Sequence, residues 1–169
     1  MRPRSGEGMQ QADRTAPETG PDMEGAARRH WMGLLARAAP KTLAERLATF
    51  DHALPAFAWL RRPETGSVMV RGRAGGTGAP FNLGEMTVTR CVLRLEDGTV
   101  GHAYVQGRDE RHAERAALVD AMMQTSQAES LRAEVLDPLT EAEAHARAER
   151  AEKAAATRVE FFTVARGED

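Results

Sequence analysis

The stretch that decides the fold is residues 85–106, which read EMTVTRCVLRLEDGTVGHAYVQ. Between Glu85 and Leu95 the side chains alternate, and one face of that segment is polar, which is typical of a β-strand. Asp97-Gly98 is a strong signal for a tight turn, and Thr99–Gln106 has the composition of a returning strand. The stretch therefore predicts an antiparallel β-hairpin.

Two more strands are predicted upstream of this hairpin. Residues 57–62 have the composition of a strand, and residues 67–73 alternate around two valines. Pro63-Glu64-Thr65-Gly66 lies between them and is a turn signal. Together with the hairpin, these segments predict an antiparallel sheet of about four strands.

Helical patterns flank the predicted sheet on both sides. Residues 23–39 carry apolar side chains at helical spacing, and Pro40 ends that pattern. A second helix is expected from Thr42, as N-cap, to Asp51. The fold class is therefore predicted to be α+β, with N-terminal and C-terminal helices beside one sheet.

The C-terminal half contributes two further predicted helices. Asp109 is expected to cap the first, whose core-facing stripe is Leu118, Ala121, Met122 and Thr125. After Pro138, residues 139 to about 159 form a charged, alanine-rich pattern with very few large apolar side chains. A long helix with so little to bury is expected to reach toward another chain.

Composition narrows the class of protein. The chain has 169 residues, so one domain over residues 23–167 is predicted, preceded by a disordered tail over residues 1–22. A formal net charge of −2 argues against nucleic acid or anionic lipid as a partner. The sequence shows no signal peptide or membrane span, and its single cysteine fits a reducing compartment, so a cytoplasmic location is expected.

A glycine-rich loop is the first candidate site. Glycines allow several backbone amides to converge on a phosphate, and neighbouring arginines would add positive charge. However, no Lys-Ser or Lys-Thr follows Gly78, so the loop is not a P-loop, and it lacks the dinucleotide-binding pattern as well. The alternative is a plain connection between strands. The candidate anion-binding residues of this loop are Arg71, Arg73, Gly75, Gly76, Thr77 and Gly78.

The second candidate lies at the start of the helix after Asp109. Arg108, His112 and Arg115 are three to four residues apart and would form one positive face near a helix N-terminus, where anions bind. His112 and Glu114 form half of a zinc-deaminase motif, but the chain lacks the paired cysteines which that chemistry requires. A metal site made by this chain is therefore not expected.

Glu114 is the third candidate, since it lies at the edge of an apolar helix stripe. A carboxylate in that position needs a partner, and Arg90 or Arg94 on the predicted strand is a reasonable one. A structural ion pair between Arg90 and Glu114 stands as the alternative to a phosphate-binding role. Cys91 has no activating neighbour in the sequence, and an inert buried thiol is expected.

A set of short motifs in a fixed order resembles the PhnG family of the bacterial carbon–phosphorus lyase machinery. The resemblance covers about residues 27–167, and it depends on the order and spacing of the motifs together. The motifs are Arg29-His30-Trp31-Met32, Gly75-Gly76-Thr77-Gly78, Thr89-Arg90, Leu95-Glu96-Asp97-Gly98, Val105-Gln106-Gly107-Arg108-Asp109, His112-Ala113-Glu114-Arg115 and Arg158-Val159-Glu160-Phe161-Phe162-Thr163.

The resemblance implies a subunit that works with PhnH, PhnI and PhnJ in a two-fold core complex, with PhnL functionally linked. It implies that this assembly displaces adenine from MgATP with a phosphonate, giving α-D-ribose 1-phosphonate 5-triphosphate in organic phosphonate catabolism. The chain would act as a non-autonomous transferase subunit and bind no cofactor alone. The alternative is a scaffold that only holds the core complex together. The family supplies no catalytic residue to carry over.

Overall fold

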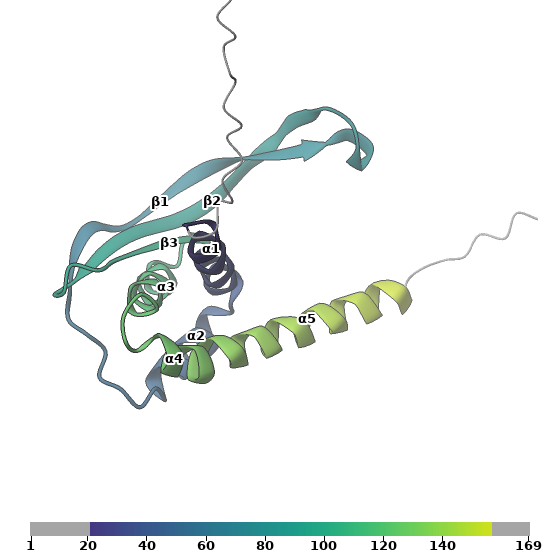
Figure 1. The fold of residues 1–169 in the computed structure, drawn as a ribbon. Helices are drawn as coiled ribbons and strands as arrows, with labels where there is room; N and C mark the ends of the chain where they lie inside the picture. The colour runs from purple at the N-terminus through teal and green to yellow at the C-terminus, as the bar shows by residue number, and fades with distance from the viewer. Residues whose placement is uncertain (1–20, 157–169) are drawn as a thin grey trace, which may run out of the picture.

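Residues 21–156 are described here from a computed structural model, with side chains from Gly25 onward. A three-stranded antiparallel sheet forms one layer, in the order β1 (Phe57–Arg73), β2 (Pro80–Leu95), β3 (Val100–Gln106). The helices lie on one side of it (Figure 1). The predicted α+β class is confirmed, although the sheet has three strands where about four were predicted.

The predicted turn at residues 63–66 is wrong, because this segment lies inside β1. The pairing of β1 with β2 shifts register between Trp59 and Arg61 and again between Arg61 and Glu64. Such bulges bend a strand without ending it, and an edge strand tolerates a proline that donates no hydrogen bond. Pro63 is therefore accommodated on the outer strand, and two predicted strands become one.

The predicted turn at Asp97-Gly98 is confirmed. Gly98 has a φ of 91°, which favours glycine, and the Asp97 side chain accepts a hydrogen bond from the Thr99 amide at 2.8 Å. The pairing of β2 with β3 then runs from Arg94 opposite Val100 to Val88 opposite Gln106. β3 ends there, while β1 and β2 continue together.

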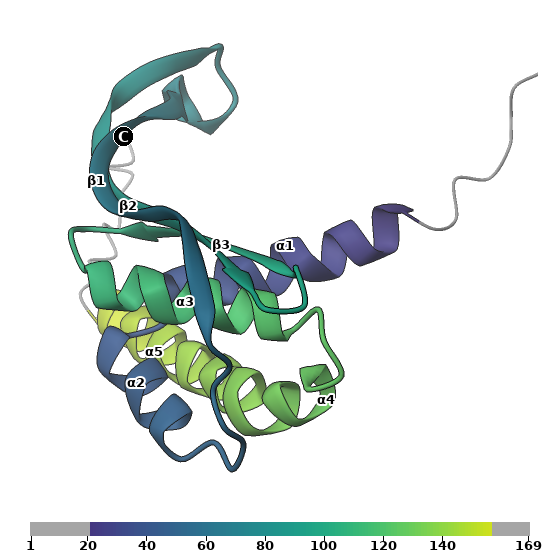
Figure 2. The ribbon, with the colours of Figure 1, turned by 90° about the vertical axis from the view of Figure 1, so that its left-hand side faces the viewer.

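This continuation is a two-stranded ribbon over residues 67–87, which we call the arm. It starts with Ser67 opposite Thr87 and ends with Arg73 opposite Pro80. Figures 1 and 2 show it extending away from the helices. The sheet therefore has a helix-covered half and an uncovered half.

Two helices precede the sheet. α1 spans Pro21–Arg37, and α2 spans Pro40–Ala48 with Ala39 as its N-cap. The prediction of Thr42 as N-cap is wrong, because Pro40 already has the φ that a first helical turn requires. α1 and α2 contribute Trp31, Leu35 and Leu43 to the core.

α3 (Glu110–Met122) packs closely on β3. The predicted N-cap is confirmed, since Asp109 accepts a hydrogen bond from the His112 amide at 2.9 Å. The two elements approach so closely that a Cβ atom added to Gly101 would lie 2.8 Å from Ala121 Cβ. Leu118, Ala121 and Met122 are buried as predicted, whereas Thr125 is half-buried.

The described part of the chain ends in a helical series that sequence patterns only partly predicted. α4 (Ala128–Leu131) and a π-helical segment (Arg132–Leu136) lead into α5 (Asp137–Ala156). In Figure 1 the arm and α5 extend to the same side of the body, one above the other. Across the described residues, no helix is long and apolar enough to cross a membrane.

Candidate functional site

The glycine-rich loop forms the tip of the arm. Ala74–Gly76 is a 3₁₀ turn in which Gly75 and Gly76 have φ angles of 59° and 80°. The Gly78 amide donates to the Ala74 carbonyl at 2.9 Å, so it is already used within the turn. These glycines are explained by the turn geometry alone.

The two arginines of the arm differ in whether they form a hydrogen bond within the ribbon. Arg73 donates from Nη1 to the Gly78 carbonyl at 3.1 Å and so closes the tip. Arg71 and Thr77 are exposed. Arg73 is exposed as well, so within the described residues Arg71 is the exposed arginine of the arm that makes no hydrogen bond to the ribbon.

The predicted positive face at the start of α3 is only partly present. Arg108 is exposed and Arg115 is half-buried, but His112 is 3% exposed and faces the core. Its Nε2 lies 2.8 Å from the Leu35 carbonyl of α1. A helix turns 100° per residue, and this places His112 on the core-facing stripe of α3. Its hydrogen bond to Leu35 therefore fastens α3 to α1.

The two candidate anion sites are far apart. Gly107, just before α3, donates its amide to the Thr87 carbonyl at 2.9 Å, which places it at the base of the arm. From Thr87 to Pro80 at the tip, an extended strand covers roughly 23 Å. The loop at the tip of the arm and Arg108 therefore do not form one site.

The predicted ion pair between Arg90 and Glu114 is not formed. Arg90 Nε donates to Glu64 Oε1 at 2.6 Å, and its Nη1 donates to Tyr104 Oη at 3.1 Å. Successive residues of a strand point to opposite faces, so Arg90 lies on the outer face when Cys91 lies on the helix-covered face. Glu114 lies near Cys91 instead. Burial, and secondly the charge of Glu114, raise the pKa of the Cys91 thiol to about 12.

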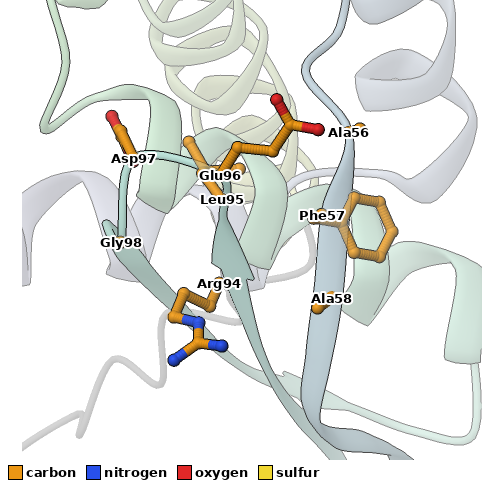
Figure 3. A pocket seen from close by; sticks show the side chains of 8 residues that line it. All are labelled: Ala56, Phe57, Ala58, Arg94, Leu95, Glu96, Asp97 and Gly98. Atoms are coloured by element: carbon orange, nitrogen blue, oxygen red, sulfur yellow. The ribbon is translucent and has the colours of Figure 1, made fainter.

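A shallow cavity of about 470 Å³ adjoins the Asp97-Gly98 turn. Its charged residues are Arg94, Glu96 and Asp97, and their side chains point in different directions (Figure 3). The hydrogen bond from the Thr99 amide lowers the pKa of Asp97. The cavity thus lacks a converging acid and base. Within residues 25–156, no group of His, Cys, Asp or Glu side chains is placed to hold a metal ion.

A larger groove of about 840 Å³ lies between α5 and the base of the arm. The Arg37–Glu143 ion pair, with Nε and Oε1 2.7 Å apart, crosses one side of it. The groove is lined by Ala36, Arg37, Ala38, Ala39, Pro40, Thr42, Met86, Gln106, His112, Leu139, Ala142, Glu143, Ala146 and Arg150.

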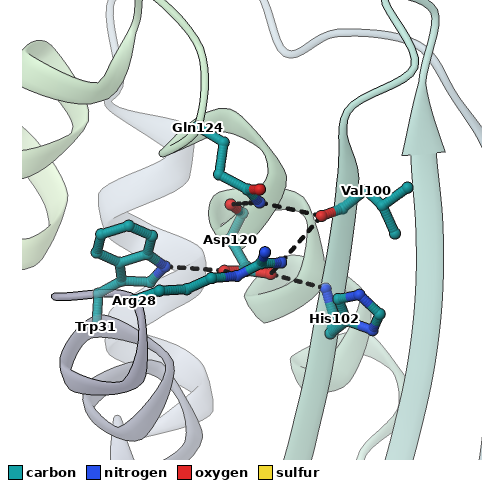
Figure 4. A network of polar contacts seen from close by, with 6 residues as sticks. All are labelled: Arg28, Trp31, Val100, His102, Asp120 and Gln124. Carbon is teal, nitrogen blue, oxygen red and sulfur yellow. Dashed lines mark hydrogen bonds and ion pairs between the residues drawn. The ribbon is translucent and has the colours of Figure 1, made fainter. Parts of the chain in front are cut away.

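Asp120 is the most connected polar residue of the described chain, and sequence analysis did not single it out. Its side chain is fully buried on α3. Its carboxylate accepts hydrogen bonds from Arg28 at 2.7 and 3.1 Å, from Trp31 Nε1 at 2.8 Å and from the His102 amide at 2.8 Å. It therefore joins α1, α3 and β3 (Figure 4).

The network around Asp120 is complete. Arg28 Nη2 and Gln124 Nε2 both donate to the Val100 carbonyl at 3.0 Å. Among the described residues, no buried side-chain polar atom lacks a partner. A fully bonded carboxylate is typical of a structural role. The signal in the sequence was an acid inside the apolar run Ala116–Met123, which needs partners wherever it is buried.

Comparison with known proteins agrees with the resemblance in the sequence. The family model described as phosphonate metabolism protein PhnG matches residues 26–167. The alpha-D-ribose 1-methylphosphonate 5-triphosphate synthase subunit PhnG of Rhizobium meliloti (strain 1021) is 48% identical over 157 residues, covering 91% of this chain and 98% of that protein. A match over nearly the full length of both chains shows common ancestry of the whole domain. The chain belongs to the PhnG family.

Proposed function

We propose that this chain is a subunit of a phosphonate ribosyl triphosphate synthase that acts in the cytoplasm on organic phosphonates. The observation that carries the proposal is the 48% identity to a protein named as such a subunit, over 98% of its length. In the proposed reaction, a phosphonate displaces adenine from MgATP, which is a substrate of the assembly. The product is α-D-ribose 1-phosphonate 5-triphosphate. The proposed partners are PhnH, PhnI and PhnJ in a two-fold core complex, with PhnL functionally linked.

The shape of the arm supports a role within an assembly. A two-stranded ribbon is only marginally stable in water by itself. The arm nevertheless exposes Met69 by 52%, Phe81 by 46% and Leu83 by 66%. Met, aromatic and Arg side chains are enriched where proteins contact each other, and Arg71 is exposed on the same ribbon. We infer that the arm contacts another subunit.

A purely structural scaffold is the second candidate function. Two of the predicted anion ligands favour it, because they form hydrogen bonds within the chain itself. His112 binds the Leu35 carbonyl, and Arg73 binds the Gly78 carbonyl at the tip of the arm. Arg71 and Arg108, which are exposed, are the groups that would distinguish a substrate contact from a scaffold.

Reconstitution tests the main proposal. Adenine release from MgATP with methylphosphonate is measured for the other subunits together, with and without this chain. We expect release only when the chain is present, and no turnover by the chain alone. Full activity of the other subunits without it would overturn the proposal.

Substitutions separate the two candidate functions. The combined variant Arg71→Ala and Arg108→Ala is compared with Arg132→Ala, another exposed arginine, distant from both candidate sites. If the double variant assembles normally but releases less adenine, these arginines contact a substrate or shape its site. If it assembles with normal activity, while Met69→Ser with Leu83→Ser prevents assembly, the chain is a scaffold.

A further inference from the structure

The groove between α5 and the base of the arm brings together segments that are far apart in the sequence. Its lining residues come from α1, α2, α3, α5 and the strands β2 and β3, and more than half of them are Ala, Pro, Leu or Met. Leu139 of α5 is buried and Met86 of β2 is half-buried. A concave, mostly apolar site of about 840 Å³ has the size and character of small-molecule sites, where a few polar groups fix the orientation of the ligand.

His112 offers one such polar group to the groove. The Leu35 carbonyl can only accept, so His112 Nε2 carries the proton of their hydrogen bond, and Nδ1 is the acceptor of the neutral ring. Nδ1 bonds to no described residue, yet no polar side-chain atom sealed inside the described chain lacks a partner. Nδ1 is therefore open to solvent, and the groove that His112 lines is the space it faces. A ligand there would donate an N–H or O–H group to it.

A cation lies further along α5. Ala142, Ala146 and Arg150 are four residues apart, so they form one row on the side of α5 that lines the groove. Glu143 is bound by Arg37, whereas Arg150 forms no ion pair with any acidic side chain of residues 25–156. The groove therefore has a positive charge to spare, which fits an anionic group on the ligand.

The separation of the two groups sets the length of the ligand. Arg150 lies seven residues beyond Glu143, which is about 10 Å along α5. Glu143 binds Arg37, two residues after the Leu35 carbonyl that holds His112. A ligand that reaches both ends must therefore span on the order of 10 Å, which excludes a lone phosphate ion. A nucleotide has this length, an amino group at one end, phosphates at the other and a flat base between them.

We propose that the groove binds an adenine nucleotide, whose amino group donates to His112 Nδ1 and whose phosphates lie at Arg150. The base contacts the apolar walls between these two groups. The choice of adenine rests on the proposed function, in which MgATP is a substrate of the assembly. The proposal adds a nucleotide site on this chain, outside the arm and away from the positive face predicted at Arg108.

Isothermal titration calorimetry of the full chain with MgATP tests the site. Purine riboside 5′-triphosphate has hydrogen in place of the amino group, so it leaves His112 Nδ1 without a donor, and we expect it to bind at least about tenfold more weakly. Tripolyphosphate cannot reach His112, and we expect at least the same loss. Affinity equal to that of ATP for either compound would overturn the proposal, and so would the absence of ATP binding.

Substitutions at exposed or half-buried positions locate the binding. Ala146→Trp fills the groove and should abolish binding, while Ala148→Trp should not change it, because Ala148 is exposed and lies about 200° around the helix. Arg150→Ala should weaken ATP binding about tenfold, because a charge-assisted contact with phosphate is lost. Arg132→Ala, which removes an exposed arginine outside the groove, is its control. Equal effects within either pair would place the nucleotide elsewhere and overturn the proposal.

The outcome is separable from that of reconstitution. If the chain is required for adenine release but does not bind MgATP in the groove, only the nucleotide site is wrong. If the chain binds MgATP as expected but the other subunits are fully active without it, the site stands and the proposed function is wrong.

Discussion

The helix-covered half of the sheet and the arm are made by the same two strands, yet they use apolar residues in opposite ways. On the covered half, Cys91, Leu93 and Leu95 of β2 are at most 5% exposed beneath α3. On the arm, Phe81 and Leu83 of the same strand are about half exposed or more. One half completes its core within the chain, and the other leaves apolar surface for contact.

The two halves also differ in their polar interactions: the covered half has a buried network that joins several elements, and the arm has local hydrogen bonds. The covered half encloses Asp120, whose carboxylate binds donors from α1 and β3. Hydrogen bonds from side chains of the arm are local, as between Arg73 and the Gly78 carbonyl. We therefore expect substitutions in the covered half to lower the free energy of unfolding, and substitutions in the arm to act on assembly instead.

The largest expected effect is that of Asp120→Ala. Removing the carboxylate leaves the Arg28 guanidinium without its counter-ion and the Trp31 and His102 N–H groups without an acceptor. The cost of breaking a buried pair is about 3–5 kcal/mol, and we expect about 3 because Arg28 is 31% exposed. Urea unfolding followed by circular dichroism measures it.

The matched control for Asp120→Ala is Glu85→Ala, which removes an exposed acid from the arm. We expect it to change the free energy of unfolding by less than about 0.5 kcal/mol. Equal losses for the two variants would mean that the arm is packed as firmly as the covered half, and the contrast between the halves would be wrong.

The second largest effect is expected for Gly101→Ala, at the close contact between β3 and α3. In Gly101→Ala, the added Cβ would contact the Ala117 carbonyl and lie 2.8 Å from Ala121 Cβ, so β3 and α3 must separate. Overpacking of this kind costs about 1–3 kcal/mol. We expect a loss near 2 kcal/mol by urea unfolding.

Gly84→Ala on the arm is the corresponding control, since its Cβ would meet no atom within 4 Å. We expect a change of less than about 1 kcal/mol, because glycine costs conformational entropy in a strand. A loss near 2 kcal/mol in both variants would show that something covers the arm at Gly84.

Local signals in the sequence predicted much of the covered half. The turn at Asp97-Gly98 and the cap at Asp109 depend on residues close in sequence, and both predictions are confirmed. The prediction of a turn at Pro63 is wrong, because the strand continues there through a shift in register. That shift depends on how β1 pairs with β2, which is a tertiary interaction.

The candidate site was less predictable than the fold. Helical spacing placed His112 beside Arg108, but spacing alone does not say which side of α3 faces the core. Arg90 binds Glu64 on the neighbouring strand. The register of the two strands sets this pair, and the distance between the two residues in sequence does not reveal it. Asp120 was missed because its partners come from segments 18 to 92 residues away.

The smallest expected effect lies at the boundary between the two halves, in the ion pair of Arg37 with Glu143. The hydrogen bond from Arg37 lowers the pKa of Glu143 below its usual 4.5. A lowered pKa in the folded state means that the pair stabilises the fold above pH 4.5, and that this contribution is lost as the pH falls through the lowered pKa. Glu143→Gln should therefore cost about 0.5 kcal/mol at pH 7, since Arg37 is largely exposed.

Urea unfolding of the original chain and of Glu143→Gln at pH 7, 5 and 3 checks this dependence. We expect the difference between them to be nearly the same at pH 7 and 5 and smaller at pH 3, because Glu143 of the unfolded chain is protonated well below pH 4.5 while the folded chain still holds it ionised until the pH falls through its lowered pKa. A difference that persists undiminished at lower pH would mean that Glu143 acts through packing against the groove rather than through its charge. α5 would then be held to the body by contacts of the kind seen in the covered half, and the boundary would move outward along the helix.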